Sequence, residues 1–273
     1  MPSRSDPATA APGYGADLAY AHQAGHSDFV RLATPTILRY LRAAGVSGAA
    51  RERVVDLGCG TGILAAALLG AGYRVHGVDL SADMLRLARA TAPGADFVRA
   101  SFVDVDLPSC GAVVSVGQCL GYAFDPRVGE PELLRLFERA WHALRPGGLL
   151  LFDLNAPPPG RTGEAHVHVR HEADWTLIGE TVVGETALTR DLTLFRRVGD
   201  LYRRTGERHV VHLYPPDTVL DGLRAAGFTA STFHDYDGSP FGPHLVGYRA
   251  EKPWAEKPWA EKPWAEKPWA EKP

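Results

Sequence analysis

Residues 54–62 have the sequence Val-Val-Asp-Leu-Gly-Cys-Gly-Thr-Gly, an apolar run that passes directly into a loop with three glycines. An alanine- and leucine-rich segment follows, so this order predicts a strand, a tight turn and a helix, where bare backbone can approach a nucleotide-like ligand. The third glycine comes one residue earlier than in the dinucleotide-binding pattern Gly-x-Gly-x-x-Gly. Asp56, near the end of the strand, would repel a pyrophosphate and attract an ammonium group.

Short apolar runs alternate with helical patterns around this loop. From residue 53 to residue 117, RVVDL, YRVHGVD, ADFVRA and GAVVSVG alternate with TGILAAALLGAG and SADMLRLARAT. The alternation predicts βαβ units and a parallel sheet. A helix over 130–144 carries its apolar residues on one face, and Arg145-Pro146-Gly147-Gly148 ends it before the strand LLLFDL.

The region before the loop is helical in pattern. It runs from Leu18 to Ala44, with an interruption expected at Pro35 and a stop at Gly45. We therefore expect an N-terminal helical cap over 1–45 and a ligand-binding core over 46–155.

The region after Asn155 changes character and predicts an antiparallel insertion over 156–214. Strand-like segments lie near 165–183, 187–197 and 200–213, with a hairpin turn at Val198-Gly199-Asp200. The insertion is too long for a connector, so we expect it to cover the ligand site. A helix over 216–226 and the strands FTASTFHDY and HLVGYRA then complete the core sheet over 215–250.

The last segment, 251–273, consists of the repeat Ala-Glu-Lys-Pro-Trp, which begins at Ala250. A proline every five residues prevents a continuous helix or strand ladder, so we expect a disordered tail. A repeat expansion or an artificial addition accounts for it most simply, and a docking strip of exposed tryptophan rings is the alternative.

Composition narrows the functional class. The 273 residues are 45% hydrophobic and 22% charged, which excludes global disorder, and the net charge of −3 argues against a nucleic-acid partner. No apolar run approaches the length of a membrane span, and the N-terminus lacks a signal-like apolar region. Cys59, Cys110 and Cys119 lack Cys-x-x-Cys spacing, so a reducing cytoplasm fits best. We expect a cytoplasmic protein with no membrane partner, as a monomer or homodimer.

The second predicted strand ends in an acidic residue. Asp79 can accept hydrogen bonds from two ribose hydroxyls, a property shared with NAD-binding proteins. Ser81 is placed to cap the following helix, with Asp83 in its first turn, so its expected role is structural. Met84 suits either a place under an adenine ring or ordinary packing.

Together these segments resemble the class I S-adenosylmethionine-dependent methyltransferases. VVDLGCGTG resembles the first motif of that family, Asp79 its ribose-binding acid, RASFVDVDLP its adenine-binding turn, AVVSVGQCL the strand that faces the methionine part and LRPGGLLLFDL the fifth-strand motif. The resemblance implies a Rossmann-like, seven-stranded, mostly parallel sheet with helices on both faces and S-adenosyl-L-methionine as cofactor.

The resemblance also implies which residues hold the cofactor. Many members carry Asp where this chain has Ser101, but the backbone of Phe102 can still reach the adenine. The expected cofactor-binding residues are Asp56, Gly58, Gly60, Gly62, Asp79, Leu80, Met84, Ser101, Phe102, Gly117 and Gln118.

The acceptor is expected beyond the carboxyl ends of the strands, where ligands bind in open α/β sheets. Tyr122, Asn155 and the insertion's Trp175 are the candidate substrate-binding residues, although a turn before Pro157 also explains Asn155 and core packing also explains Trp175. Gln118 could orient either the cofactor or the acceptor.

The expected chemistry is in-line methyl transfer to an O, N or C atom of a small organic molecule. A general base is needed only where the acceptor must lose a proton. His209 shares the more apolar face of its strand with Val211 and Leu213, so it should face the pocket, and Tyr20 is the second candidate for proton removal or positioning. Tyr20 belongs with His22, His26 and Phe29 to a segment that could close over the cofactor, and a helix that packs its aromatic side chains on the domain is the alternative.

The sequence also bears on other ligands and on other classes of protein. His166, His168 and His171 lack a nearby Cys or paired carboxylate, so we expect no metal site. A nicotinamide or flavin oxidoreductase would explain Asp79 but not Asp56 or the glycine spacing. A non-catalytic S-adenosylmethionine-binding subunit that docks through its tail stays open.

Overall fold

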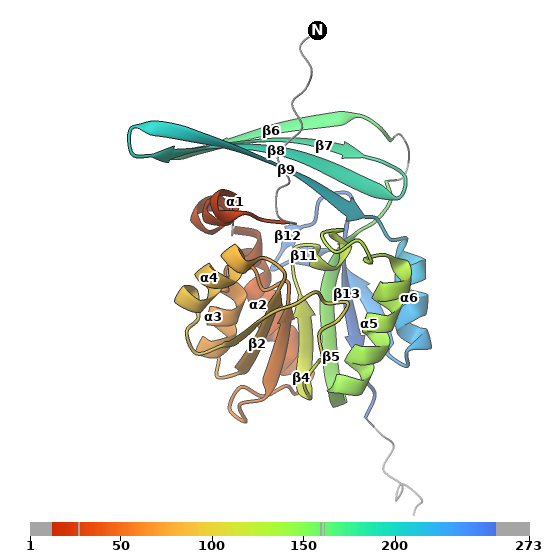
Figure 1. The fold of residues 1–273 in the computed structure, drawn as a ribbon. Coiled ribbons are helices and arrows are strands. Elements are labelled where there is room, and N and C mark those ends of the chain that lie inside the picture. Colours follow the sequence, from red (N-terminus) through yellow and green to blue (C-terminus); the bar gives the residue numbers. More distant parts are fainter. Residues whose placement is uncertain (1–12, 27, 159, 161, 255–273) are drawn as a thin grey trace, which may run out of the picture.

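The core is a seven-stranded sheet with the strand order β10-β13-β5-β4-β1-β2-β3 (Figure 1). The computed structural model describes residues 13–26, 28–158, 160 and 162–254. Strands β1 to β5 pair in parallel, whereas β13 runs antiparallel to both β5 and β10. The strands are β1 (Arg53–Leu57), β2 (Arg74–Asp79), β3 (Asp96–Arg99), β4 (Cys110–Ser115), β5 (Leu144–Asn155), β10 (Thr229–Phe233) and β13 (Leu245–Glu251). The expected fold class is confirmed.

Helices cover both faces of this sheet. Leu133 and Phe137 of α5 and Leu223 of α6 are buried on one face, and Ile37 of α2 and Leu68 of α3 are buried on the other. The helical elements are α1 (Ala16–Ala21), the π-helical turn η1 (His22–His26), α2 (Asp28–Ala43), α3 (Ile63–Gly70), α4 (Ala82–Thr91), the 3₁₀ turn η2 (Cys119–Gly121), α5 (Glu130–Ala143) and α6 (Pro216–Ala225). No helix of the described segments is long and apolar enough to cross a membrane.

The expected interruption at Pro35 is wrong, because α2 continues through this residue. Proline removes one backbone donor from a helix and costs about 3 kcal/mol. Full burial of Ile37 and Leu41 against the sheet returns roughly 1.5 to 3 kcal/mol for each side chain, which outweighs that cost. The break in the N-terminal region lies earlier instead, at η1.

A four-stranded antiparallel sheet lies across the carboxyl ends of the core strands, and we call it the roof (Figure 1). The expected segment near 165–183 divides into two strands, and Val198 pairs with Leu201 across the predicted turn, where Gly199 has a φ of +63°. The roof strands are β6 (Ala165–His171), β7 (Trp175–Val183), β8 (Ala187–Val198) and β9 (Leu201–His212). The segment after β10 also differs from expectation, since a separate small ribbon forms from β11 (Asp235–Tyr236) and β12 (Ser239–Pro240).

The roof is fastened to the N-terminal helix. Asp17 of α1 is buried and its carboxylate pairs with Arg196 (3.0 Å) and Arg203 (2.5 Å) of the roof. These guanidinium groups lower the pKa of Asp17. Beside this cluster, Leu18 packs against Leu177. The start of the repeat is described as far as Trp254, and the expectation of disorder beyond it lies outside the described residues.

Candidate functional site

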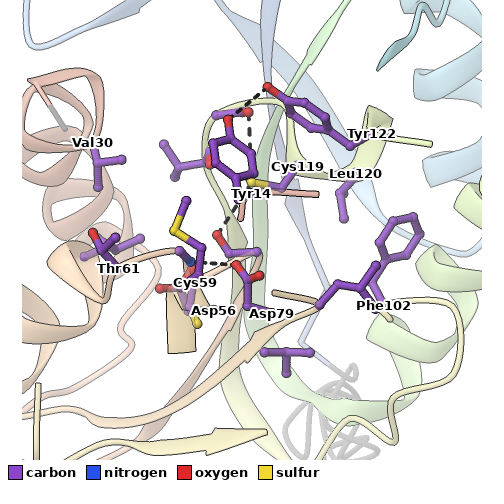
Figure 2. A pocket seen from close by; sticks show the side chains of 18 of the residues that line it. Tyr14, Val30, Asp56, Cys59, Thr61, Asp79, Phe102, Cys119, Leu120 and Tyr122 are labelled. Atoms are coloured by element: carbon purple, nitrogen blue, oxygen red, sulfur yellow. Dashed lines mark hydrogen bonds between the residues drawn. The ribbon is translucent and has the colours of Figure 1, made fainter. Parts of the chain in front are cut away.

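A cavity of about 160 Å³ lies at the carboxyl ends of β1, β2 and β4. Its wall combines loop backbone, acidic side chains and rings from the N-terminal segment (Figure 2). Of the expected cofactor residues, those that line it are Asp56, Gly58, Gly60, Asp79, Leu80, Met84, Ser101, Phe102 and Gly117.

The glycines of the first loop have distinct roles. Gly58 has a φ of +73°, and a Cβ there would lie 2.4 Å from the Cβ of Cys119, so only glycine fits. Gly60 has a φ of +52° and open space where a Cβ would stand, which leaves its bare backbone on the cavity wall. Gly62 is outside that wall, because a Cβ there would meet Ala88 of α4 at 3.0 Å. Gly62 thus permits close packing of α3 on α4 and does not line the first cavity.

Asp56 is a buried acid in the wall of this cavity with an unpartnered carboxylate oxygen. Its side chain is 2% exposed, and its Oδ2 has no hydrogen-bond partner among the described residues. Burial, and then the charge of nearby Asp79, raise the pKa of Asp56 to about 7. A buried orphan oxygen of this kind is an acceptor for a ligand donor, and an ammonium group would also satisfy its charge.

Asp79 connects the glycine loop to α4. Its Oδ2 accepts a hydrogen bond from the Gly60 N–H (2.9 Å), and its Oδ1 accepts one from the Ser81 N–H (2.8 Å). Burial raises the pKa of Asp79, and these backbone donors oppose the rise. Ser81 caps α4 by accepting from the Met84 N–H (3.2 Å), as expected, and its hydroxyl donates to the carbonyl of Tyr14 (2.8 Å).

The wall beyond β3 contains a carboxylate that sequence reasoning missed. Asp125 lines the cavity together with Ser101 and Phe102. Its Oδ1 accepts from Arg127 Nε (3.0 Å), and this guanidinium, helped by the Ser101 hydroxyl, holds the pKa of Asp125 well below its usual range. Asp125 therefore brings a negative charge to the place where Ser101 replaces the acid of many relatives.

A second missed residue, Asp153 of β5, holds the turn after β4. It is fully buried and accepts hydrogen bonds from Gly117 N–H (3.0 Å), Gln118 N–H (2.6 Å) and the Tyr236 hydroxyl (2.6 Å). Burial raises the pKa of Asp153 to about 6 despite these donors. The signal in the sequence was one acid inside the apolar run of β5, LLLFDL.

The side chains of Gln118 and Asn155 contact each other, and Gln118 also contacts the roof. Gln118 Oε1 accepts from Asn155 Nδ2 (2.8 Å) and from Arg190 Nη2 (3.0 Å) of the roof. Neither residue belongs to the wall of the first cavity, so only the backbone of Gln118 supports that wall, through Asp153.

A second cavity, of about 360 Å³, lies between the roof and the core. It shares Tyr14, His22 and Tyr122 with the wall of the first cavity, so the two are neighbours. The hydroxyls of Tyr14 and Tyr122 face each other at 3.5 Å (Figure 2). The residues that line only the second cavity are Leu18, His168, Leu177, Thr181, Arg190, Leu192 and His209.

His209 lies on the inward face of β9, as the alternation predicts. It is 1% exposed, and its Nε2 is 2.8 Å from Glu207 Oε2, while Glu207 Oε1 accepts from the Gly15 N–H (2.8 Å). In the neutral imidazole, this carboxylate, which can only accept, holds the proton on Nε2 and so leaves a lone pair on Nδ1. This Nδ1 is buried and has no partner among the described residues. The rings of Tyr14 (5.0 Å) and Phe124 (4.9 Å) pack around the imidazole.

Two expected residues, Tyr20 and Trp175, lie outside both cavities. The Tyr20 hydroxyl donates to Asp174 (2.6 Å), and Arg196 lies 3.6 Å above its ring. Trp175 is 1% exposed and packs with Leu18 in the roof's core. Leu18 of α1 packs in the roof's core. The residues of this segment that line both cavities are therefore Tyr14 and His22, and Tyr20 lines neither. The side chain of His26 lies outside the described residues.

The expectation about metals concerns His166, His168 and His171 of β6. Within the part of the chain that the structure describes, no group of three or more His, Cys, Asp or Glu side chains could hold a metal ion.

Comparison with known proteins places this site in a family. A family model described as a methyltransferase domain matches residues 54–148. A putative methyltransferase from Geobacillus sp. (strain WCH70) is 30% identical over 208 residues, which cover 71% of this chain and 79% of that protein. The trans-aconitate 2-methyltransferase of Paracidovorax citrulli is 30% identical over 194 residues, or 63% of this chain and 65% of that one.

A solved structure agrees in fold. The S-adenosylmethionine-bound structure of CalS10, an amino pentose methyltransferase from Micromonospora echinaspora, has a TM-score of 0.68 at 18% identity and covers 88% of this chain and 98% of its own. The chain belongs to the class I S-adenosylmethionine-dependent methyltransferases. It is an enzyme that uses S-adenosylmethionine, and an oxidoreductase is excluded.

The first cavity fits this cofactor. Asp56 offers an unpaired buried oxygen, Asp79 a carboxylate, and Gly60 and Gly117 bare backbone with open space beside it. When bound, S-adenosylmethionine supplies a methyl group on a positively charged sulfur, which is already an activated leaving group. The chain's own residues then have to orient the acceptor, exclude water and, for a protonated acceptor, remove a proton.

Proposed function

We propose that the methyl acceptor is a small organic molecule that enters the second cavity. Its volume of about 360 Å³ lies within the usual range for small-molecule sites. Its wall joins apolar side chains such as Leu177 and Leu192 to a few polar groups, the composition that binds and orients such ligands. The Paracidovorax citrulli relative is itself named for a small acid.

The position of this cavity supports direct transfer between the two sites. Tyr14, His22 and Tyr122 belong to both walls, so an acceptor under the roof stands beside whatever fills the first cavity. In-line displacement needs the reacting atoms about 3 Å apart and little else. The roof and α1 supply the enclosure that keeps water away from them.

We assign proton removal to His209, and one observation carries this assignment: its Nδ1 is buried without a partner while Glu207 fixes Nε2. A base whose second nitrogen is held by a carboxylate is the arrangement that activates hydroxyl and amine nucleophiles. The O–H or N–H proton of the acceptor would pass to Nδ1, and Glu207 would stabilise the imidazolium that forms.

The test is methyl transfer from radiolabelled S-adenosylmethionine to a panel of phenols, alcohols and amines, with wild type and His209→Gln. Labelled product with the wild type and a strong loss with the variant support the assignment. Equal turnover by both proteins would remove His209 from the reaction. Tight cofactor binding without product from any of these compounds would contradict the proposed acceptor class.

The cytoplasm remains our proposed location, and a monomer or homodimer our proposed assembly. The three cysteines are free thiols in the structure, which fits a reducing compartment. Equilibrium sedimentation of the full chain would decide the assembly state.

A further inference from the structure

The guanidinium group of Arg190 has a different environment from those of neighbouring roof arginines. Arg190 lies on β8, directly opposite His209 of β9 in the ladder, and both side chains line the second cavity. Its Nη1 donates to the Tyr122 hydroxyl (2.8 Å) and its Nη2 to Gln118 Oε1 (3.0 Å). Both partners are neutral.

Of the other roof arginines, Arg170, Arg196, Arg203 and Arg208 each pair with a carboxylate, whereas Arg197 and Arg204 are exposed to solvent. Arg196 and Arg203 pair with Asp17, and Arg208 pairs with Asp191 at 2.6 Å. Arg190, in contrast, forms no ion pair with any carboxylate of the described residues, although it is half-buried. A partly desolvated positive charge without a counter-ion is unfavourable, so a ligand anion would bind there with advantage.

The remainder of the cavity wall contributes no negative charge. Among the described residues, no Asp or Glu belongs to it. The carboxylate of Glu207 contacts His209 of this wall, and it is already hydrogen-bonded to the His209 ring and to the Gly15 N–H. The charged groups in the wall of the second cavity therefore favour an anion, whereas Asp56, Asp79 and Asp125 in the wall of the first cavity do not.

We propose that the acceptor carries a carboxylate, which binds the guanidinium of Arg190, and a separate hydroxyl or amino group, which receives the methyl beside His209. This inference rests on the proposed function of the second cavity. A planar guanidinium matches a carboxylate in a bidentate pair, and one fixed positive charge matches one negative charge. Pairing with Arg190 withdraws electron density from the carboxylate and makes it a poorer nucleophile. The carboxylate therefore anchors the acceptor, and the neutral oxygen or nitrogen atom attacks the methyl group.

The experiment compares matched acids and amides: 4-hydroxybenzoate with 4-hydroxybenzamide, and 4-aminophenylacetate with its amide. Each is titrated calorimetrically into the protein saturated with S-adenosylhomocysteine. Arg190→Gln and Arg190→Lys are the test variants, and Arg208→Gln, an exposed arginine of the same sheet, is the matched control.

We expect at least one acid to bind about ten-fold more tightly than its amide, which corresponds to the strength of a charge-assisted pair. Arg190→Gln should reduce this preference to below about two-fold, Arg190→Lys should keep part of it, and Arg208→Gln should keep all of it. Binding of S-adenosylhomocysteine should be the same in all four proteins.

Three results would overturn the proposal: equal binding of acids and amides, an acid preference that survives Arg190→Gln, or no binding of any acid to a protein that binds S-adenosylhomocysteine. The last result leaves the cofactor site intact and so does not touch the family assignment. A methylated product that is an alkali-labile ester would also contradict the proposal, because the carboxylate would then be the methylated group.

Discussion

The first cavity is lined by the acids Asp56, Asp79 and Asp125, whereas the second is lined by Arg190 and three histidines. The first is formed largely by strand ends within residues 54–148, the part that the methyltransferase family model matches. The second takes most of its wall from the roof, which lies outside that match. On the proposed function, cofactor binding is a property of the part shared with the family, and the choice of acceptor is a property of the roof. Four changes test this division.

The largest effect is expected on turnover from His209→Gln. Loss of a general base lowers kcat by about 10²- to 10⁴-fold, and S-adenosylhomocysteine binding should be unchanged because His209 does not line the first cavity. Tyr20→Phe is the matched control, since its hydroxyl contacts Asp174 outside both cavities. Steady-state kinetics with the best acceptor measures both variants. A loss of cofactor affinity in His209→Gln would contradict the division between a cofactor site in the first cavity and an acceptor site in the second.

Gly58→Ala should damage the core itself. The left-handed backbone costs a non-glycine residue about 1 to 2 kcal/mol, and the overlap with Cys119 adds about 1 to 3 kcal/mol. Urea unfolding should show this loss of stability. Gly60→Ala is the control: it adds only the backbone cost, because no atom lies within 4 Å of its Cβ. Equal stability of the two variants would contradict the Cys119 contact.

Asp56→Asn should weaken the binding of S-adenosylhomocysteine by about 10- to 100-fold, the range for a hydrogen bond to a charged group. Asp221→Asn on the exposed surface of α6 is the control. Calorimetric titration gives both constants. Unchanged affinity in Asp56→Asn would mean that the orphan oxygen faces no part of the ligand.

The smallest expected effect is a pH dependence caused by the carboxyl group of Asp56. Its folded pKa of about 7 is above the unfolded value of about 3.9, so the folded protein binds more protons between these values. Stability of the ligand-free protein therefore falls as pH rises through this window. A ligand ammonium favours the ionised form, so affinity for S-adenosylhomocysteine should rise by up to about ten-fold from about pH 6 to pH 8. The affinity trend should vanish in Asp56→Asn, and an affinity trend that persists there belongs to another group. The stability trend should become shallower without vanishing, because burial also raises the pKa of Asp79 and of Asp153.

The sequence predicted the first cavity well because its determinants are local. Asp56 and Asp79 stand at the ends of strands, and Met84 follows Ser81 at a helix start, so spacing alone places them at one sheet edge. The face on which His209 lies could also be predicted, because side chains alternate between the two faces along one strand.

The determinants of the second cavity depend on contacts between distant parts of the chain. Arg190 meets Tyr122 and Gln118 only because the roof rests on the turn after β4. Tyr14 precedes α1 in a segment without periodicity, and its backbone is held by Ser81, far along the chain. The local sequence pattern indicated Tyr20 instead. The orientation of α1 is determined by the packing of Leu18 with Trp175 in the roof's core, a contact between distant parts of the chain.

A crystal structure with S-adenosylhomocysteine tests the central claim most directly. The account predicts the ribose hydroxyls on the carboxylate of Asp79 and the sulfur in contact with the shared wall of Tyr14, His22 and Tyr122, open to the cavity beneath the roof. A nucleotide bound beneath the roof, or a sulfur turned away from that shared wall, would contradict it.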